Sequence, residues 1–165
     1  ILGTCRGLDG GCDCDHHNAG DLYYNDIWIF KLNANREIEW QECYGGSYFE
    51  NGSSIIEEEQ YYTVLADSDS NDGQLNLHHG TTETSDIWFF KIDKQGNLIH
   101  SKVLGGSSYD RADAIFKNEQ TGGYTIFAHT ESNNFDVSGN HCGQNNYCWE
   151  DIWYVEIDSL GEILH

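Results

Sequence analysis

A pattern of seven apolar and polar positions recurs along the chain. Asp26-Ile27-Trp28-Ile29-Phe30-Lys31-Leu32 returns at 86–92 and at 151–157, and each copy begins with Asp, Ile and Trp. Alternate residues of a strand point to opposite faces, so Trp and Phe share one face of this strand while the two Ile residues share the other. Both faces are apolar. This predicts a strand buried on both sides, in a sheet packed between two other sheets.

The recurring strand divides the chain into three units. The repeat distance is 60 residues from Asp26 to Asp86 and 65 from Asp86 to Asp151. Such a period is too long for a solenoid coil, and it suits a four-stranded antiparallel blade of a β-propeller with one long loop. We predict one propeller domain that comprises a partial blade at 1–46, a full blade at 47–106 and a blade at 107–165 that ends within its last strand.

Short apolar runs between turn residues predict the strands of each unit. In the middle unit the runs are 53–57, 61–66, 86–92 and 98–104, and in the last unit the first two are 114–117 and 124–129. The total is about 2.75 blades of an all-β, β-propeller-like fold, whereas a closed ring usually needs at least about four. We expect the rest of a longer parent chain to complete the propeller, in preference to an assembly of copies.

Charge and composition narrow the function classes. Asp and Glu number 28 against 8 Lys and Arg, and the net charge of −20 repels phosphate backbones and anionic membranes. We expect no nucleic-acid partner, and since no stretch approaches about 18 apolar residues, we expect no membrane insertion. The chain has neither a starting Met nor a leader, so we expect its native termini and any export signal to lie elsewhere.

An even set of cysteines favours an oxidising, extracellular setting. The chain has six of them, and Cys142 with Cys148 is the best predicted disulfide because it closes a short loop. Cys5, Cys12 and Cys14 are neighbours in sequence, and they can pair with one another or with Cys43.

A series of short motifs accompanies the recurring strand. In the middle unit they are Ser68, Ser70, Asp72-Gly73, His79-Gly80, Asp86, Trp88, Lys91-Ile92-Asp93 and Gly105-Gly106-Ser107, followed in the last unit by Gly122-Gly123-Tyr124. The series resembles the propeller-like repeats of large secreted and surface proteins of the Bacteroidetes, many of them cargo of the type nine secretion system. The resemblance implies a propeller fold and an extracellular or cell-surface location, and it says almost nothing about the ligand. The first unit departs most, with Cys5, Gly7 and Asn18 at motif positions.

The connection before each recurring strand is rich in acidic residues, Asn, Gly and His. Oxygen ligands at alternate positions with a Gly between them suit calcium, and the candidates are Asp9, Asp13, Asp15, Asp69 and Asp72. The alternative is Asx turns, in which these side chains bond their own backbone. A zinc site at Cys12, Cys14, Asp15, His16 and His17 is a lesser hypothesis, since the Cys spacing departs from that of known zinc sites.

Histidine and aspartate recur at matching places in all three units. The residues are His17, His79 and His141 with Asp26, Asp86 and Asp151, each Asp two positions before Trp28, Trp88 or Trp153. Chemistry would need such a residue only once. We therefore expect a structural role, in which the His and Asp hydrogen-bond a loop beside the Trp.

The functional prediction rests on loops rather than on a catalytic motif. The chain has no Gly-x-Ser-x-Gly elbow, His-Glu-x-x-His or phosphate loop, so we expect no enzyme. Loop aromatics that could stack on a sugar or a protein partner are Tyr23, Tyr24, Tyr48, Tyr147 and Trp149. The chain is predicted to be a non-catalytic scaffold or binding module, with adhesion as the expected role, that binds a protein or glycan at the cell surface. The runner-up is a carbohydrate-binding or calcium-stabilised propeller of an exoenzyme, and a glycoside-directed catalyst comes third.

Overall fold

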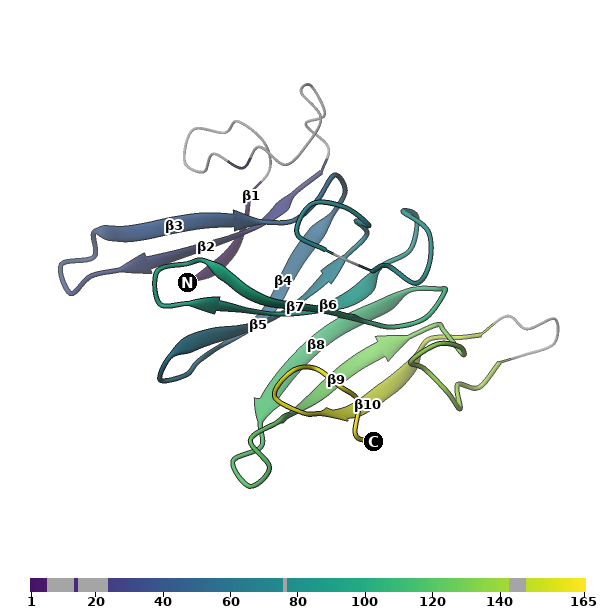
Figure 1. The fold of residues 1–165 in the computed structure, drawn as a ribbon. Coiled ribbons are helices and arrows are strands. Elements are labelled where there is room, and N and C mark those ends of the chain that lie inside the picture. The colour runs from purple at the N-terminus through teal and green to yellow at the C-terminus, as the bar shows by residue number, and fades with distance from the viewer. Residues whose placement is uncertain (6–13, 15–23, 76, 143–147) are drawn as a thin grey trace.

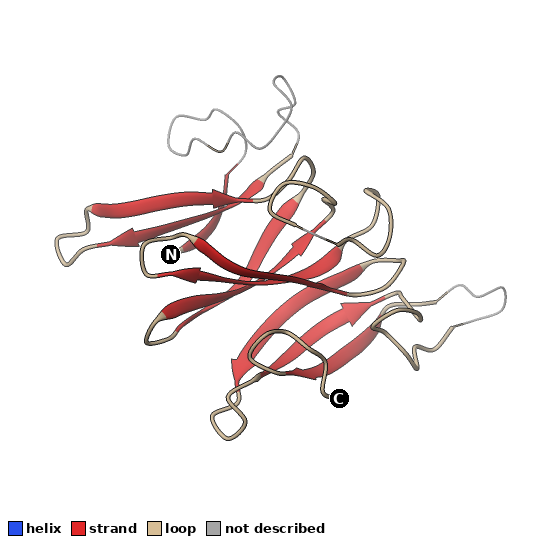
Figure 2. Cartoon of the chain, viewed as in Figure 1, coloured by secondary structure: helices blue, strands red, loops and turns tan. Residues whose placement is uncertain are grey.

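Antiparallel sheets make up all of the regular structure that is described. The computed structural model describes residues 1–5, 14, 24–75, 77–142 and 148–165, and every assigned element in them is a strand (Figure 2). The first sheet contains β1 (Leu2–Cys5), β2 (Asp26–Leu32) and β3 (Ile38–Tyr44). The second contains β4 (Glu50–Glu57), β5 (Tyr61–Ser68), β6 (Asp86–Asp93) and β7 (Leu98–Leu104). The third contains β8 (Asp110–Lys117), β9 (Tyr124–Thr130) and β10 (Asp151–Ile157).

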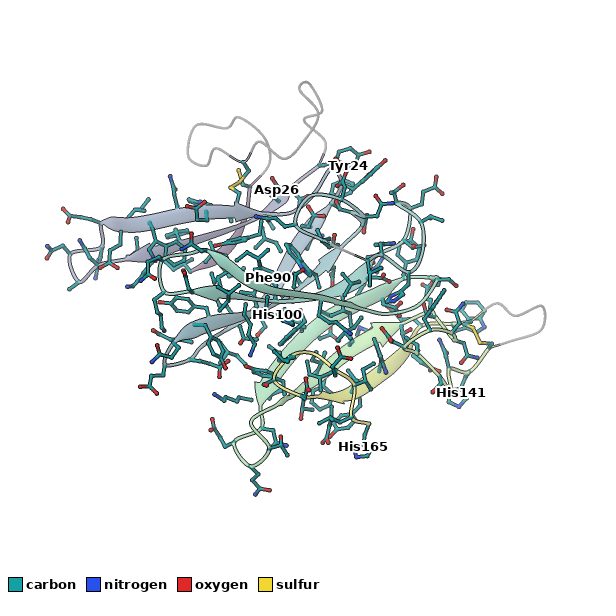
Figure 3. All side chains as sticks on the ribbon, in the orientation of Figure 1. Tyr24, Asp26, Phe90, His100, His141 and His165 are labelled. Atoms are coloured by element: carbon teal, nitrogen blue, oxygen red, sulfur yellow. A yellow bond between two sulfur atoms is a disulfide. The ribbon has the colours of Figure 1, made fainter. Side chains whose placement is uncertain are left out.

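The second sheet lies between the other two, and its two faces belong to two separate apolar cores (Figure 1). Trp88 and Phe90 of β6 pack in the core shared with the first sheet, whereas Phe89 packs in the core shared with the third. All three side chains are fully buried. Figure 3 shows Phe90 deep within the molecule. The predicted strand with two buried faces is therefore confirmed for the middle unit, and we call the two contacts between sheets the first and the second seam.

The predicted all-β architecture of three successive antiparallel sheets is confirmed, whereas their arrangement as propeller blades stays a prediction. The second sheet has its four strands in sequence order, while the first and third have three each. A fourth strand begins beside β10, where Ile163 forms an isolated bridge to Ile157. The described residues do not close the sheets into a ring.

Two predicted strands begin earlier than expected because each contains a β-bulge. β4 starts at Glu50 rather than at residue 53, and β8 starts at Asp110 rather than at residue 114. The register with the neighbouring strand shifts between Gly52 and Ser54, and again between Ala112 and Ala114. A bulge inserts one residue and breaks the period-2 alternation, so the first half of each strand looks like a turn in the sequence.

Hairpin loops of one kind join the last two strands of a unit. Asp93 Oδ1 accepts hydrogen bonds from the backbone N–H groups of Gln95 and Asn97, each at 2.9 Å. Asp158 Oδ1 accepts the corresponding bonds from Leu160 and Glu162. The Asn97 side-chain amide also donates to Asp93 Oδ2 at 2.8 Å, and this bond, with the backbone bonds, holds the pKa of Asp93 below the usual range. The backbone bonds from Glu162 and Leu160 do the same for the pKa of Asp158.

One disulfide ties Cys14 to strand β3, and another closes a short loop within the connection between β9 and β10. Cys142 and Cys148 are bonded as predicted, and Cys14 is bonded to Cys43, which was one of the open alternatives. Cys5 is also disulfide-bonded, and Cys12 lies outside the described residues. The described part of the chain contains no helix long and apolar enough to cross a membrane.

Candidate functional site

The long connections between strands gather at one edge of the stacked sheets, which we call the loop edge (Figure 1). It contains 45–49 and 105–109, which lead from one sheet to the next, and the described parts of the longer connections at 69–85 and 131–150. Loops on a rigid scaffold are where binding residues usually lie. The loop edge is therefore the candidate site.

At the first seam, side chains of one loop hold the backbone of the loop before it. Asp72 accepts a hydrogen bond from the Ser47 backbone N–H at 2.8 Å and another from the Ser47 hydroxyl at 2.7 Å. Ser70 Oγ accepts from the Tyr48 N–H at 2.9 Å. Gln74 completes the contact, since its side chain accepts from the Gly45 N–H at 2.9 Å. The two loops are thus joined as one unit.

The second seam repeats these bonds about 60 residues later. Asn134 Oδ1 accepts from the Ser107 N–H and Ser132 Oγ from the Ser108 N–H, both at 2.9 Å. Asp136 accepts from the Gly105 N–H at 3.2 Å. The neutral Asn134 takes the place of Asp72, so this position serves hydrogen bonding without a charge.

The two predicted calcium ligands that the structure describes, Asp69 and Asp72, lie in different surroundings. Both carboxylate oxygens of Asp72 accept hydrogen bonds from Ser47. Burial raises the pKa of Asp69 to about 6, while His78 and Arg111 oppose that rise. No group of three or more metal-ligating side chains occurs among the described residues. Asp9, Asp13 and Asp15 lie outside them, as do His16, His17 and Cys12 of the zinc hypothesis, so calcium stays a prediction.

Pairs of carboxyl groups are buried at the seams beside the loop edge. Asp110 accepts from the Gly106 N–H at 2.6 Å, from Ser132 Oγ at 2.8 Å and from Thr130 Oγ1. A side-chain carbon on Gly105 would lie 2.6 Å from Asp86 Oδ1 and 2.8 Å from Asp110 Oδ2, so both carboxyl groups converge on one glycine. Burial is the main cause that raises the pKa values of Asp86 and Asp110.

The first seam has the equivalent pair, Asp26 and Glu50, and both are fully buried. Glu50 accepts from Ser68 Oγ at 2.7 Å and from the Gly46 N–H at 3.0 Å. Burial raises the pKa of Glu50, and the nearby Asp26 adds to the rise. The buried pair recurs at both seams and holds loops in place, so it does not offer an accessible acid and base for catalysis.

The recurring His and Asp bond each other across the long connections. The backbone N–H of His79 donates to Asp86 Oδ2 at 2.6 Å, and the backbone N–H of His141 donates to Asp151 Oδ2 at 2.8 Å. His141 Nδ1 also lies 2.7 Å from Asp151 Oδ2, at the loop edge (Figure 3). These bonds fix the loop to the first residue of the next strand, beside Trp88 and Trp153. His17 lies outside the described residues.

A polar hollow of about 600 Å³ opens at the loop edge of the second seam. Its lining consists of hydroxyl, amide and carboxylate side chains and one disulfide, namely Ser107, Ser108, Glu131, Ser132, Asn133, Asn134, Cys142 and Cys148. The sequence analysis did not identify this hollow. Its serines and asparagines come from the loop before β8 and from the connection after β9. The pairing of Asp110 with Thr130 at the ends of these two strands brings them together.

The candidate stacking aromatics divide into packed and exposed residues. Tyr24 packs edge-on against Tyr48 and Phe49, with ring centroids 5.3 and 4.8 Å apart. Trp149 is 69% exposed and follows Cys148 of the hollow lining. Tyr23 and Tyr147 lie outside the described residues. Trp149 is therefore the candidate that could stack on a ligand near the hollow.

Sequence reasoning also missed a buried polar cluster at the opposite end of the second seam. Glu58 accepts hydrogen bonds from Thr63 Oγ1 at 2.6 Å and from the hydroxyl of Tyr124, and it pairs with the Lys117 ammonium. Burial opposes ionisation of Glu58, but the Lys117 ammonium and the two hydroxyls outweigh it and lower the pKa. The signal in the sequence is weak, because these residues are far apart and do not recur.

The seam loops give a direct stability prediction. Gly73 has φ +66°, and a side-chain carbon there would lie 2.5 Å from the carbonyl oxygen of Gly45. We expect Gly73→Ala to cost about 2 kcal/mol of unfolding free energy, from backbone strain and from the clash with the neighbouring loop. The measurement is urea unfolding followed by tryptophan fluorescence.

Gly122→Ala is the matched control. Gly122 also has a positive φ, of +75°, but no atom lies within 4 Å of the added carbon, so it should cost only the strain, about 1 kcal/mol. Equal costs for the two variants would show that the loop contact at Gly73 contributes nothing.

Comparison with known proteins gives no assignment. No protein-family model matches the chain, and no curated protein sequence matches it.

Proposed function

We propose that this chain is a non-catalytic binding module of a secreted or cell-surface protein, made of β-propeller blades and acting in adhesion. The observation that carries the proposal is the polar hollow at the loop edge, lined by hydroxyl and amide groups from two neighbouring loops. It lies on a scaffold that the buried seams hold rigid. A hollow with several hydrogen-bonding groups of fixed position suits recognition of a polar ligand.

The buried carboxyl groups at the seams support a role without catalysis. The seam carboxyl groups of Glu50, Asp86 and Asp110 are fully buried, and they accept hydrogen bonds from loop N–H groups, hydroxyls or both. A general acid or base must come within hydrogen-bond reach of a substrate. In the described seams these groups serve the scaffold instead.

The disulfides support a location outside the cell. Structural disulfides persist in oxidising compartments and are rare in the cytosol, and this chain has Cys14–Cys43 and Cys142–Cys148 among its described residues. The resemblance of the repeat to Bacteroidetes surface proteins agrees with such a location.

A carbohydrate ligand is the second candidate, and Trp149 favours it. An exposed indole beside hydroxyl and amide groups offers both a stacking surface and hydrogen-bond partners for a sugar ring. Trp149 is 69% exposed, and it adjoins the disulfide that lines the hollow. A protein ligand would use the same residues as an anchor, so only binding data can separate the two.

The experiment measures binding of the chain to a glycan array and to intact bacterial and animal cells. We expect saturable binding to one of these surfaces, and we expect Ser108→Trp, which fills the hollow, to weaken it at least about tenfold. Leu77→Ala is the matched control, because Leu77 is 68% exposed on the preceding loop and does not line the hollow. Binding to cells with no binding to the array favours a protein ligand.

Two results would contradict the proposal. One is the absence of saturable binding to both surfaces. The other is turnover of a polysaccharide that a single carboxylate substitution abolishes, because this would make the chain a catalyst.

A further inference from the structure

The outer face of the third sheet presents a patch of exposed apolar side chains. Its residues are Phe116 on β8, Phe127 on β9, and Ile152 and Tyr154 on β10, which are 57%, 40%, 75% and 49% exposed. The ring centroids of Phe116 and Phe127 lie 6.0 Å apart, and those of Phe127 and Tyr154 lie 5.5 Å apart. The patch thus crosses all three strands of the sheet. We call these four residues the outer face.

The same four positions of the second sheet form the second seam. Leu65 pairs with Phe89 across β5 and β6 as Phe127 pairs with Tyr154 across β9 and β10. The other two equivalents are Ile56 and Ile87, which correspond to Phe116 and Ile152. Leu65, Ile87 and Phe89 are fully buried in the core shared with the third sheet, and Ile56 packs against it.

The first seam uses the same positions again. Ile27 and Ile29 of β2 are buried against the second sheet, and Leu2 of β1 packs on the same core. Every sheet therefore carries one face built to cover the next sheet. On the third sheet, no described residue of this chain provides the next sheet.

At both seams, the face that the preceding sheet covers has the same kinds of side chains. The second sheet receives the first with Trp88, Phe90, Val64 and Ala66. The third sheet receives the second with Trp153, Val155, Ile126 and Ala128. Each receiving face thus has a tryptophan, an apolar residue two positions after it, and small and branched apolar residues on the neighbouring strand. We expect the outer face to pack against a face of this kind.

The first sheet carries such a receiving face at the opposite end of the stack (Figure 1). Trp28 and Phe30 lie on it with their ring centroids 4.5 Å apart, and both are half-buried. Gly3 occupies the position of Ala66, since it pairs with Trp28 as Ala66 pairs with Trp88. Trp28 also lines a hollow of about 150 Å³ together with Gln41, Glu42 and Cys43. The chain therefore presents both halves of a seam, one at each end.

We propose that the outer face of the third sheet binds the Trp28 face of a second copy of this chain, so that copies associate head to tail through a third seam. The argument is continuity, because the geometry of the two seams within the chain continues across the contact. A head-to-tail contact joins two different surfaces, so it generates either a closed ring or an open filament. This inference does not depend on the ligand of the hollow.

Charge opposes the association and sets the conditions of the test. Each copy carries a net charge of −20, so two copies repel each other at low ionic strength. Salt at about 0.5 M shortens the Debye length to a few ångströms and screens this repulsion. We therefore expect association to strengthen with salt, as expected for an apolar contact between like-charged molecules.

The experiment is sedimentation velocity of the chain at about 1–100 μM in that salt. We expect dimers or larger species that become monomers in Ile152→Asp, because a charge in the seam would be buried without a partner. Trp28→Ala removes the receiving face and should have the same effect. Gln41→Arg is a second receiving-face variant that does not disturb a core, since Gln41 is exposed and pairs with Phe30. Unchanged circular dichroism shows that each variant is folded.

Mixing the variants tests the head-to-tail arrangement. Ile152→Asp keeps a normal Trp28 face and Gln41→Arg keeps a normal outer face, so an equimolar mixture should form one seam and stop at a 1:1 dimer. Association of Gln41→Arg and Trp28→Ala with themselves would show that two outer faces meet, and this overturns the proposal. A wild-type chain that stays monomeric at about 100 μM and 0.5 M salt also overturns it, and leaves the outer face to a different polypeptide segment.

Discussion

Replacing Trp88 with alanine is expected to lower the free energy of unfolding by about 3–5 kcal/mol. Trp88 is fully buried between the first and second sheets, and its ring stacks on Phe90 at a centroid distance of 4.2 Å. Its Nε1 donates to Ser101 Oγ at 2.9 Å. The substitution removes a large apolar surface from the seam, and the sheets on either side cannot collapse into the cavity without breaking their own register. Urea unfolding followed by circular dichroism measures the change.

Trp149→Ala is the matched control for Trp88. The Trp149 side chain is 69% exposed, so its removal should change the free energy of unfolding by less than about 0.5 kcal/mol. A cost below about 1 kcal/mol for Trp88→Ala would contradict the stacked sheets. A large cost for Trp149→Ala would instead show that the disulfide loop is part of the core.

Stability is expected to fall as the pH rises from about 5 to 8. Burial raises the pKa of Asp67 to about 7, although its bond from the Ala112 N–H opposes the rise. Burial also raises the pKa values of Glu50, Asp86 and Asp110. The folded state holds these protons more tightly than the unfolded state. Their stabilising contribution is complete below the unfolded pKa, near 4, and is lost as the pH rises through the folded pKa.

Other carboxyl groups act in the opposite sense at lower pH. The pKa values of Asp93, Asp158 and Glu58 are lowered in the folded state. The stability that these groups contribute is present above the unfolded pKa, near 4, and is lost as the pH falls through their folded pKa values. The two sets together place the maximum of stability near pH 5.

Urea midpoints between pH 3 and 9 test this profile, with Asp67→Asn as the diagnostic variant. Asparagine keeps the oxygen that accepts from Ala112 but does not titrate. The variant should therefore lose less stability than the wild type between about pH 5 and 8, by on the order of 2–3 kcal/mol for this partly shielded group. A wild-type midpoint that rises steadily from pH 5 to 8 would refute the prediction.

The sequence predicted the strands well where apolar alternation is unbroken, and less well where it is interrupted. β7 has the predicted bounds, and β6 is longer than predicted by one residue. β4 and β8 were predicted too short, since the bulges near Ser53 and Asp113 move the alternation by one position. An inserted residue cannot be told from the end of a strand until the partner strand is known.

The candidate site was predicted only in part, because some of its residues bond within one loop and others bond to a separate loop. The pairing of Cys142 with Cys148 could be predicted because the two residues close a short loop and are near each other in the sequence. The bonds from Asp72 to Ser47 and from Asn134 to Ser107 join separate loops. Acidic residues and asparagines with regular spacing suit calcium, Asx turns or cross-loop bonds equally well in a sequence. The choice among these for Asp72 depends on which loop lies beside it.

The threefold Asp-Ile-Trp strand by itself determined that the chain is all-β and built of repeats, with a middle strand buried on both faces. Local alternation carries this information, since side chains of one strand must point to opposite faces. Only the tertiary structure decided that carboxyl groups 24 residues apart, Asp86 and Asp110, converge on Gly105. It alone also brought together the loops before β8 and after β9 that line the hollow, and it left the Phe127 face without a partner sheet among the described residues. These features depend on which strands pair and on how one sheet fits the next, and no single stretch of sequence contains that information.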